Sequence, residues 1–342
     1  MSLRFSHRPA ATQPIVLNEQ AIVDNLTEDN MKMTWASRRT WEDEHLYLVH
    51  GQGTAAGNTP PCTLAVKKFQ SINQALQVDN NAKYRYNSEM FLLASNSHDN
   101  IIKVVGLIQR EDTIMLVYEY PVNGSLQSWL SQPMDAGQPL SWPQRRFIAI
   151  GVANGLCHLH HRCKRPIIHQ NINSNNILLD HNFKPVIAGF DAAQMNMAGL
   201  DQPLPIAGLP LGNFGYAAPE YGVAASELTE KVDTYSFGVL MLELVTGRMA
   251  NEAGADGHLA TWARKNFTEL MANQQEMFQS VVDADIPDQA RYMKEMATVF
   301  RLGVDFTVVD PQKRPSMRMA LKRLCRGCGR GPFRGLLACY LM

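Results

Sequence analysis

The clearest pattern in the sequence is an apolar stripe with the spacing of a long helix. Residues 141–143 open this segment with Ser-Trp-Pro, and the stripe runs through Ile148, Val152, Leu156 and Leu159. Apolar residues recur at every third or fourth position, so one face of the helix is expected to lie in the protein core. The stripe therefore indicates packing rather than a cofactor site.

Short apolar runs predict strands on both sides of this helix, at residues 46–49, 63–69, 113–120, 177–179 and 185–187. The last two runs are each followed by a polar loop. Nearer the start, residues 17–30 have helical spacing through Ile22, Leu26 and Met31, which predicts a further helix.

Composition limits the possible classes of protein. The chain has 342 residues, of which 45% are hydrophobic, and this is enough to bury a core. Lys plus Arg and Asp plus Glu number 32 each, so no overall charge favours nucleic acid or an acidic partner. Residues 237–245 are too short to span a membrane and contain Glu243, so they predict a buried helix. Residues 1–14 have no apolar run typical of a signal peptide and are expected to be disordered.

The cysteines show no disulfide framework, which fits a reducing cytosol. There are six, at Cys62, Cys157, Cys163, Cys325, Cys328 and Cys339. Cys325 and Cys328 form a C-x-x-C pair, but no second pair follows at zinc spacing. We therefore expect no metal there.

The polar loops after the two short strands lie in residues 167–191, IIHQNINSNNILLDHNFKPVIAGFD. This stretch resembles the H-R-D-L-K-x-x-N catalytic loop and the D-F-G metal loop of protein kinases. The surrounding sequence, about residues 15–325, resembles the intracellular domain of plant leucine-rich-repeat receptor-like kinases. The resemblance implies a bilobal α+β protein-kinase fold, with a small lobe of five antiparallel strands and one main helix and a larger helical lobe.

Compared with that family, the catalytic loop is degenerate. His169 and Asn176 match the family's histidine and metal-binding asparagine, while Gln170, Asn171 and Asn173 replace the arginine, the aspartate and the lysine. An amide such as Asn171 can orient a hydroxyl but is not a base near neutral pH. Loss of a positioned base typically costs roughly 10²- to 10⁴-fold in rate.

The metal loop is altered as well. It reads Gly189-Phe190-Asp191 where a working kinase has Asp-Phe-Gly, so Gly189 stands at the position of the principal magnesium ligand. Asp191 lies two residues further on, where the family's backbone turns on glycine, and is interpreted as a solvated turn aspartate. We therefore expect impaired Mg²⁺ binding.

The resemblance also implies a nucleotide pocket. Residues 64–67 match the V-A-I-K strand motif, and Lys67 matches its phosphate-binding lysine, which we expect to pair with Glu89. The other residues assigned to the pocket by resemblance are Ala65, Tyr118, Glu119 and Leu178.

Two features of that pocket are unfavourable for ATP. Pro121 stands where a backbone N–H normally bonds the adenine ring, and proline has no such donor. Residues 39–45, RTWEDEH, contain acidic residues and no glycine where the family's glycine-rich loop covers the phosphates. We expect no bound cofactor, and at most weak ATP binding.

The residues that hold a kinase fold together are retained, by the same resemblance. They are Glu220 of the A-P-E motif and its partner Arg314, Asp233, which braces the catalytic loop, and the apolar column Leu93, His169 and Phe190.

The segment between Gly189 and Glu220 contains no serine or threonine, and its only hydroxyl is Tyr216. Phosphorylation acts through new charge paired with arginine, and Gln170 has replaced the usual arginine. We therefore expect that this segment is not switched in the ordinary way. Its many apolar residues, such as Met197, predict either a packed plug over the cleft, which we favour, or an exposed docking strip.

The end of the chain departs from the family. Residues 326–342 are glycine-rich and basic, and they end in Cys339-Tyr-Leu-Met, which matches a C-a-a-X prenylation signal. The arginines upstream would supply the second signal that stable membrane anchoring needs. The alternative is an accidental tail without a function.

The predicted boundaries are a disordered start at 1–14, a kinase-like N-lobe at 15–120, a kinase-like C-lobe at 121–325 and a basic tail at 326–342. We expect a catalytically inactive pseudokinase that binds receptor-like kinases or other signalling proteins and no nucleic acid. We place it in the cytoplasm, with peripheral contact to the plasma membrane if Cys339 carries a lipid. The alternatives are a weakly active, ATP-dependent serine/threonine kinase that uses Lys67, Asn176 and Asp191, and a degenerate product with no role.

Overall fold

The computed structural model describes residues 18–27, 29, 31–32, 44–51, 62–69, 80–110, 113–131, 138–205, 214–222, 227–252, 257–272 and 276–326. Three predictions concern residues outside these ranges: most of the segment expected for the glycine-rich loop, the disordered start, and the tail with Cys339. They stay predictions, as do the boundaries of the lobes.

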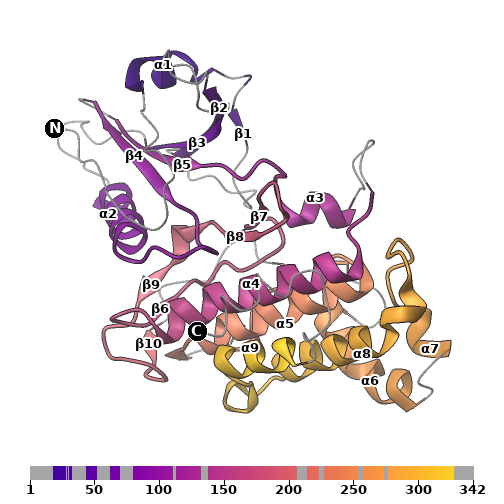
Figure 1. Cartoon of the computed structure of the whole chain (residues 1–342). Helices are drawn as coiled ribbons and strands as arrows, with labels where there is room; N and C mark the ends of the chain where they lie inside the picture. The colour runs from indigo at the N-terminus through magenta and orange to yellow at the C-terminus, as the bar shows by residue number, and fades with distance from the viewer. Residues whose placement is uncertain are drawn as a thin grey trace.

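The first lobe is a five-stranded antiparallel sheet with two helices beside it (Figure 1). The strands are β1 (Met31–Lys32), β2 (Glu44–Gly51), β3 (Cys62–Phe69), β4 (Val104–Gln109) and β5 (Ile114–Glu119), in the spatial order β1-β2-β3-β5-β4. The helices are α1 (Glu19–Asp24) and α2 (Asn80–Ser95). Because β3 is the central strand, Ala65 and Val66 are completely buried.

Helix α1 is shorter than the helix predicted for residues 17–30. The side chain of Asn18 caps its start, and the backbone N–H of Asn25 closes its end on the carbonyls of the preceding turn. Ile22 packs into a small apolar cluster on the outer face of the sheet, while Met31 belongs to β1 and pairs with Tyr47. The apolar spacing that predicted a single helix therefore extends over α1 and the first residue of β1.

The second lobe is mainly helical and lies below the sheet in Figure 1. Its helices are α3 (Leu126–Ser131), α4 (Trp142–His161), α5 (Lys231–Thr246), α6 (Leu259–Ala272), α7 (Glu276–Gln279), α8 (Gln289–Phe306) and α9 (Met317–Cys325). Helices α4 and α8 pack against α5, and α9 packs against α4. Helix α5 contains the predicted buried helix of residues 237–245, and all of these residues are buried.

Three short antiparallel strand pairs lie between residues 167 and 228. They are β6 (Ile167–Ile168) with β9 (Gln194–Met195), β7 (Ile177–Leu179) with β8 (Pro185–Ile187), and β10 (Leu204–Pro205) with β11 (Glu227–Leu228). Short 3₁₀ helices follow at Phe190–Ala192, Pro219–Gly222 and Pro311–Lys313. The arrangement is the bilobal α+β architecture expected for a protein kinase. Among the described residues, no helix combines the length and the apolar character needed to cross a membrane.

Helix α5 carries a buried carboxyl group, Glu243, that tethers two loops. One oxygen of Glu243 accepts a hydrogen bond from the backbone N–H of Ala250 at 2.9 Å, and the other accepts the hydroxyl of Tyr216. The Tyr216 oxygen in turn accepts the backbone N–H of Ser174 at 3.1 Å. Burial raises the pKa of Glu243 to about 7, although the hydrogen bonds from Tyr216 and Ala250 oppose the shift.

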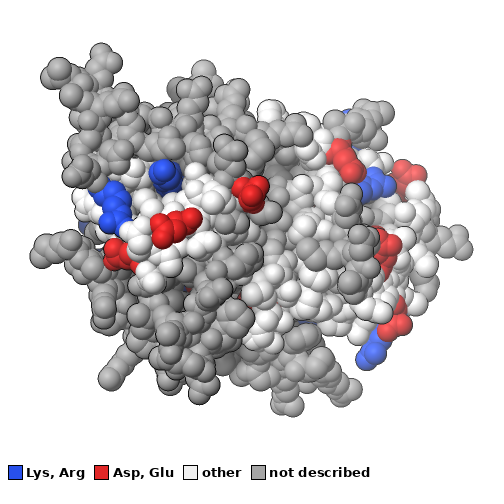
Figure 2. Space-filling view, turned by 90° about the horizontal axis from the view of Figure 1, so that it is seen from above, with Lys and Arg blue, Asp and Glu red and all other residues white. Residues whose placement is uncertain are grey.

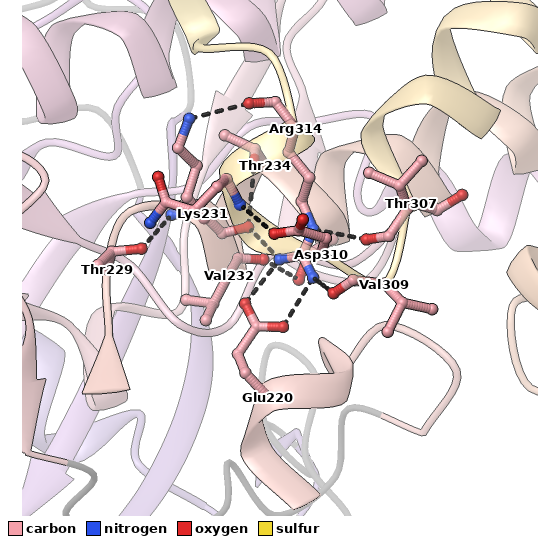
Figure 3. A network of polar contacts seen from close by, with 12 residues as sticks. Glu220, Thr229, Lys231, Val232, Thr234, Thr307, Val309, Asp310 and Arg314 are labelled. Carbon is pink, nitrogen blue, oxygen red and sulfur yellow. Dashed lines mark hydrogen bonds and ion pairs between the residues drawn. The ribbon is translucent and has the colours of Figure 1, made fainter. Parts of the chain in front are cut away.

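The predicted ion pair between Glu220 and Arg314 is present, and it ties the end of the 189–220 segment to the helical lobe (Figure 3). Arg314 is buried and donates two hydrogen bonds to the Glu220 carboxylate, at 2.6 and 2.7 Å. Its other N–H groups donate to the backbone carbonyls of Val308, Lys231 and Val309. All five donors of the guanidinium group are therefore used.

We expect Arg314→Lys to lower the free energy of unfolding by about 3 kcal/mol, because an ammonium group cannot reproduce the two-pronged contact or reach the three carbonyls. The control is Arg323→Lys, since Arg323 pairs with Asp305 at the surface, where both side chains are more than a third exposed. That change should cost less than about 1 kcal/mol. Urea unfolding of both variants measures the difference, and equal losses would contradict it.

We expect Glu243→Gln to change the pH dependence of stability. A folded-state pKa of about 7 lies above the unfolded value of about 4.5, so the native state binds the proton more tightly. The contribution of Glu243 to the free energy of unfolding is complete below pH 4.5. It decreases by roughly 3 kcal/mol as pH rises toward 7.

The stability of wild type relative to Glu243→Gln should therefore fall between pH 5 and pH 7.5 in urea titrations. The control is Glu269→Gln, which replaces an exposed carboxylate and should shift the curve uniformly. A pH-independent difference for Glu243→Gln would show that Glu243 is already ionised at pH 5.

Candidate functional site

The candidate site lies where β3, α2 and the 3₁₀ helix Phe190–Ala192 meet. Lys67 of β3 is buried, and its Nζ atom lies 2.9 Å from Oε2 of Glu89 on α2. This is the ion pair expected from the sequence. The same ammonium group also forms an ion pair with Asp191 of the 3₁₀ helix. Lys67 therefore has two carboxylate partners, one from each lobe.

Glu89 is almost fully enclosed, and its second oxygen accepts the hydroxyl of Tyr118 at 2.8 Å. Burial raises the pKa of Glu89, while the Lys67 ammonium and the two hydrogen bonds act in the opposite direction. Tyr118 was expected at the back of the adenine pocket. It is buried in β5, and its hydroxyl fixes the carboxylate of Glu89 against Lys67.

Asp191 differs from the solvated turn residue expected from the sequence. Burial alone would raise the pKa of Asp191, but the ammonium group of Lys67 and its hydrogen bond hold this pKa below its ordinary value. The Asp191 side chain is 31% exposed, against 6% for Lys67. A signal for this contact was available, because an ammonium group has three donors and the altered metal loop contains one carboxylate.

The degenerate catalytic loop is held by side-chain amides. Asn173 donates to the backbone carbonyl of Asn171 at 3.2 Å and to its side-chain oxygen at 3.0 Å. The Asn173 oxygen accepts the backbone N–H groups of Asn175 and Asn176 at 3.1 Å. Asn176 donates to the Asn171 carbonyl at 2.7 Å. The loop thus keeps an ordered shape without an ionised group at Asn171 or Asn173.

Gly189 lies directly against Asn176. Its φ angle is +78°, in the left-handed region, and a Cβ atom placed on it would lie 2.5 Å from the Asn176 side chain. The Oδ1 atom of Asn176 is buried and accepts no hydrogen bond from the described part of the chain. A side chain at position 189 would therefore require the buried Asn176 side chain to shift.

These residues do not fit the magnesium site that the fold family implies. One buried amide oxygen, on Asn176, is available, whereas the carboxylate of Asp191 is paired with Lys67. Hard divalent cations prefer several oxygen ligands, carboxylates above all. The described residues also contain no group of three or more His, Cys, Asp or Glu side chains that could hold a metal ion.

Asp233 of α5 braces the catalytic loop through its backbone. Its two oxygens accept the N–H groups of His169 at 2.8 Å and Gln170 at 2.7 Å, and His160 donates a further bond at 2.8 Å. Gln170 has a φ angle of +62°, an uncommon conformation that these bonds support. Its side-chain N–H donates to the carbonyl of Ala192 at 2.9 Å. Gln170 thus links the catalytic loop to the altered metal loop.

The apolar column expected between the lobes is buried. The rings of His169 and Phe190 meet edge to face with centroids 4.5 Å apart, and Leu93 of α2 lies in the same apolar core. Burial lowers the pKa of His169 to about 4, although Asp233 opposes the shift, so the imidazole is neutral.

The remaining pocket residues lie on β3, β5 and β7. Ala65 pairs with Tyr118 in the sheet, and both Ala65 and Leu178 are buried. Glu119 is exposed at the end of β5, and its N–H donates to the carbonyl of Lys103 at 3.2 Å. The role of these residues in an adenine pocket stays a prediction.

The hydroxyl of Tyr216 is not available at the surface. Tyr216 is buried between Ser174 and Glu243, and burial together with Glu243 raises the pKa of its phenol well above the ordinary value. Elsewhere in the same segment, Met197 and Phe214 are 65% and 74% exposed. These two side chains are exposed rather than packed as a plug, and the apolar residues between 206 and 213 lie outside the described ranges.

The protein kinase domain family matches residues 55–324 of the chain. Among the relatives in sequence is MDIS1-interacting receptor like kinase 1 of Arabidopsis thaliana, which is 35% identical over 76% of this chain and 25% of that protein. Leucine-rich repeat receptor protein kinase MSP1 of Oryza sativa subsp. japonica is 37% identical over 91% of this chain and 23% of that protein. The chain spans about a quarter of the length of these two relatives. It belongs to the protein kinase family and is of the plant leucine-rich-repeat receptor-like type.

Proposed function

We propose that the chain is a pseudokinase, a protein of the receptor-like serine/threonine kinase type that binds partners without transferring phosphate. The observation that carries this proposal is the contact between Gly189 and Asn176. The amide of Asn176 lies against position 189, where the family has its principal metal ligand. The backbone of Gly189 also has a conformation that favours glycine.

The position of the catalytic base supports the same proposal. Asn171 carries an amide whose oxygen accepts a bond from Asn173 and whose N–H lies 3.4 Å from the carbonyl of Gly189. A neutral amide cannot accept the proton of a substrate hydroxyl, so general-base catalysis is lost together with metal binding.

Binding of protein partners is the function that remains for a folded kinase domain without the catalytic base and the principal metal ligand. We propose that the chain binds receptor-like kinases or other signalling proteins in the cytoplasm. On the face shown in Figure 2, described Lys and Arg side chains lie among Asp and Glu side chains rather than in a patch of one sign. The described residues of this face therefore form no basic patch of the kind that binds nucleic acid, which supports a protein partner.

The proposal is tested on the purified protein with Mg²⁺ and ATP. We expect no transfer of labelled phosphate to itself or to a generic substrate protein, and no rise in melting temperature on addition of Mg²⁺ and ATP. Phosphate transfer above the level of a Lys67→Met variant would overturn the proposal and favour the weakly active serine/threonine kinase.

We expect that restoring the two family aspartates, with Asn171→Asp and Gly189→Asp together, does not create activity. Gly189→Asp should itself cost about 2–4 kcal/mol of stability, because it combines a left-handed backbone with a clash against Asn176.

The matched control is Gly257→Asp, since Gly257 has a similar φ angle of +88° and a Cβ placed on it lies 3.6 Å from Thr261, an ordinary contact distance. The decrease in the free energy of unfolding of this control should be smaller, and it measures backbone strain without the clash. Urea titration determines it for both variants. If Gly189→Asp is no more destabilising than Gly257→Asp, or if the double variant transfers phosphate, the steric argument for lost metal binding is wrong.

A further inference from the structure

The two carboxylates on Lys67 come from different parts of the fold. Glu89 lies on α2, beside the sheet that contains Lys67, whereas Asp191 lies in the 3₁₀ helix that follows β8 in the other lobe. We propose that Asp191 is an internal anion that occupies the phosphate-binding position of Lys67 and joins the two lobes without nucleotide. This inference rests on the proposed function and adds how the two lobes are held together at Lys67.

The turn that carries Asp191 is fixed on both sides. Phe190 packs against the ring of His169 with centroids 4.5 Å apart, and the carbonyl of Ala192 accepts the side-chain N–H of Gln170 at 2.9 Å. The N–H of Ala193 closes the turn on the carbonyl of Phe190 at 3.1 Å. The carboxylate is thus presented to Lys67 by a preorganised turn, which lowers the entropy cost of the ion pair.

The charges at the site favour an anion already in place. Lys67 contributes one positive charge, and Glu89 and Asp191 contribute one negative charge each, so the three groups together carry one negative charge. Charge-assisted hydrogen bonds to both carboxylates use two of the three donors of the ammonium group. A polyphosphate that approaches Lys67 therefore meets net negative charge and has to displace a carboxylate.

The exposed fractions of the Glu89 and Asp191 side chains indicate which of the two carboxylates a ligand can displace from Lys67. The side chains of Lys67 and Glu89 are 6% and 4% exposed, whereas the side chain of Asp191 is 31% exposed. Glu89 is also held by Tyr118, so it is bound on two sides. Asp191 is therefore the carboxylate that an anionic ligand of Lys67 would have to displace. Asp191 is therefore the group that excludes nucleotide phosphate.

The test uses Asp191→Asn, which removes the charge and keeps the size of the side chain. ATP is added in the presence of EDTA, so that no metal takes part, and binding is followed by calorimetry and by melting temperature. Wild type should bind Mg²⁺-free ATP weakly, and Asp191→Asn should bind it at least about tenfold more tightly, which corresponds to ~1.4 kcal/mol. Adding Lys67→Met to Asp191→Asn should abolish this binding.

The same variant tests the link between the lobes in the absence of ligand. Asp191→Asn should lower the melting temperature by about 3 °C, and the loss should be much smaller in a Lys67→Met background, since the partner is then absent. Asp305→Asn removes one carboxylate from the exposed pair with Arg323 and serves as the control, with little change in melting temperature and no gain of ATP binding.

Two results would overturn the inference. They are equal binding of Mg²⁺-free ATP by wild type and Asp191→Asn, and additive losses of melting temperature for Asp191→Asn and Lys67→Met. Either result would leave the proposed lack of catalysis standing. Phosphate transfer by wild type would instead overturn the proposed function, so the two failures are distinguishable.

Discussion

The bonds between Asp233 and the backbone of the catalytic loop are the interaction on which the rest of the site depends. Asp233 lies on the fully buried helix α5, and its oxygens accept two consecutive backbone N–H groups. These backbone N–H groups do not depend on the side chains of the loop. The loop can therefore keep its path with Asn171 in place of the family's catalytic base and Gln170 in place of its arginine. The fold and the chemistry of a kinase are thus separable in physical terms.

Lys67 imposes the second constraint. A buried ammonium group is costly unless it is paired, and removing one partner of a buried pair usually costs more than the pair contributes. Glu89 meets this requirement without nucleotide or metal, because one carboxylate neutralises one ammonium group. Asp191 adds a second carboxylate from within the chain, at a position displaced by two residues from the family's metal ligand. Retention of Lys67 and Glu89 therefore does not by itself indicate ATP binding.

The sequence predicted the bilobal fold, the pair of Lys67 with Glu89 and the pair of Glu220 with Arg314, since each depends on a motif with a characteristic spacing. It did not predict contacts that depend on backbone angles. The approach of Asn176 to Gly189 follows from a positive φ angle, which a sequence does not state. The pairing of Asp191 follows from a 3₁₀ turn in place of a glycine turn. Short-range spacing was likewise misleading at Met31, where a helix pattern continued into a strand.

The 189–220 segment combines these constraints. In a phosphorylation-dependent kinase, an arginine at the position of Gln170 requires a negative charge, and the phosphate supplies it. Gln170 is neutral, and its amide donates to the Ala192 carbonyl, so no charge is needed to complete its contacts. Tyr216 is committed to Glu243, and a phosphate on its oxygen would displace a bond inside the core. The described ends of the segment are therefore held by the hydrogen bonds of Gln170 and Tyr216 and by the ion pairs of Asp191 and Glu220. We expect that their position does not depend on phosphorylation.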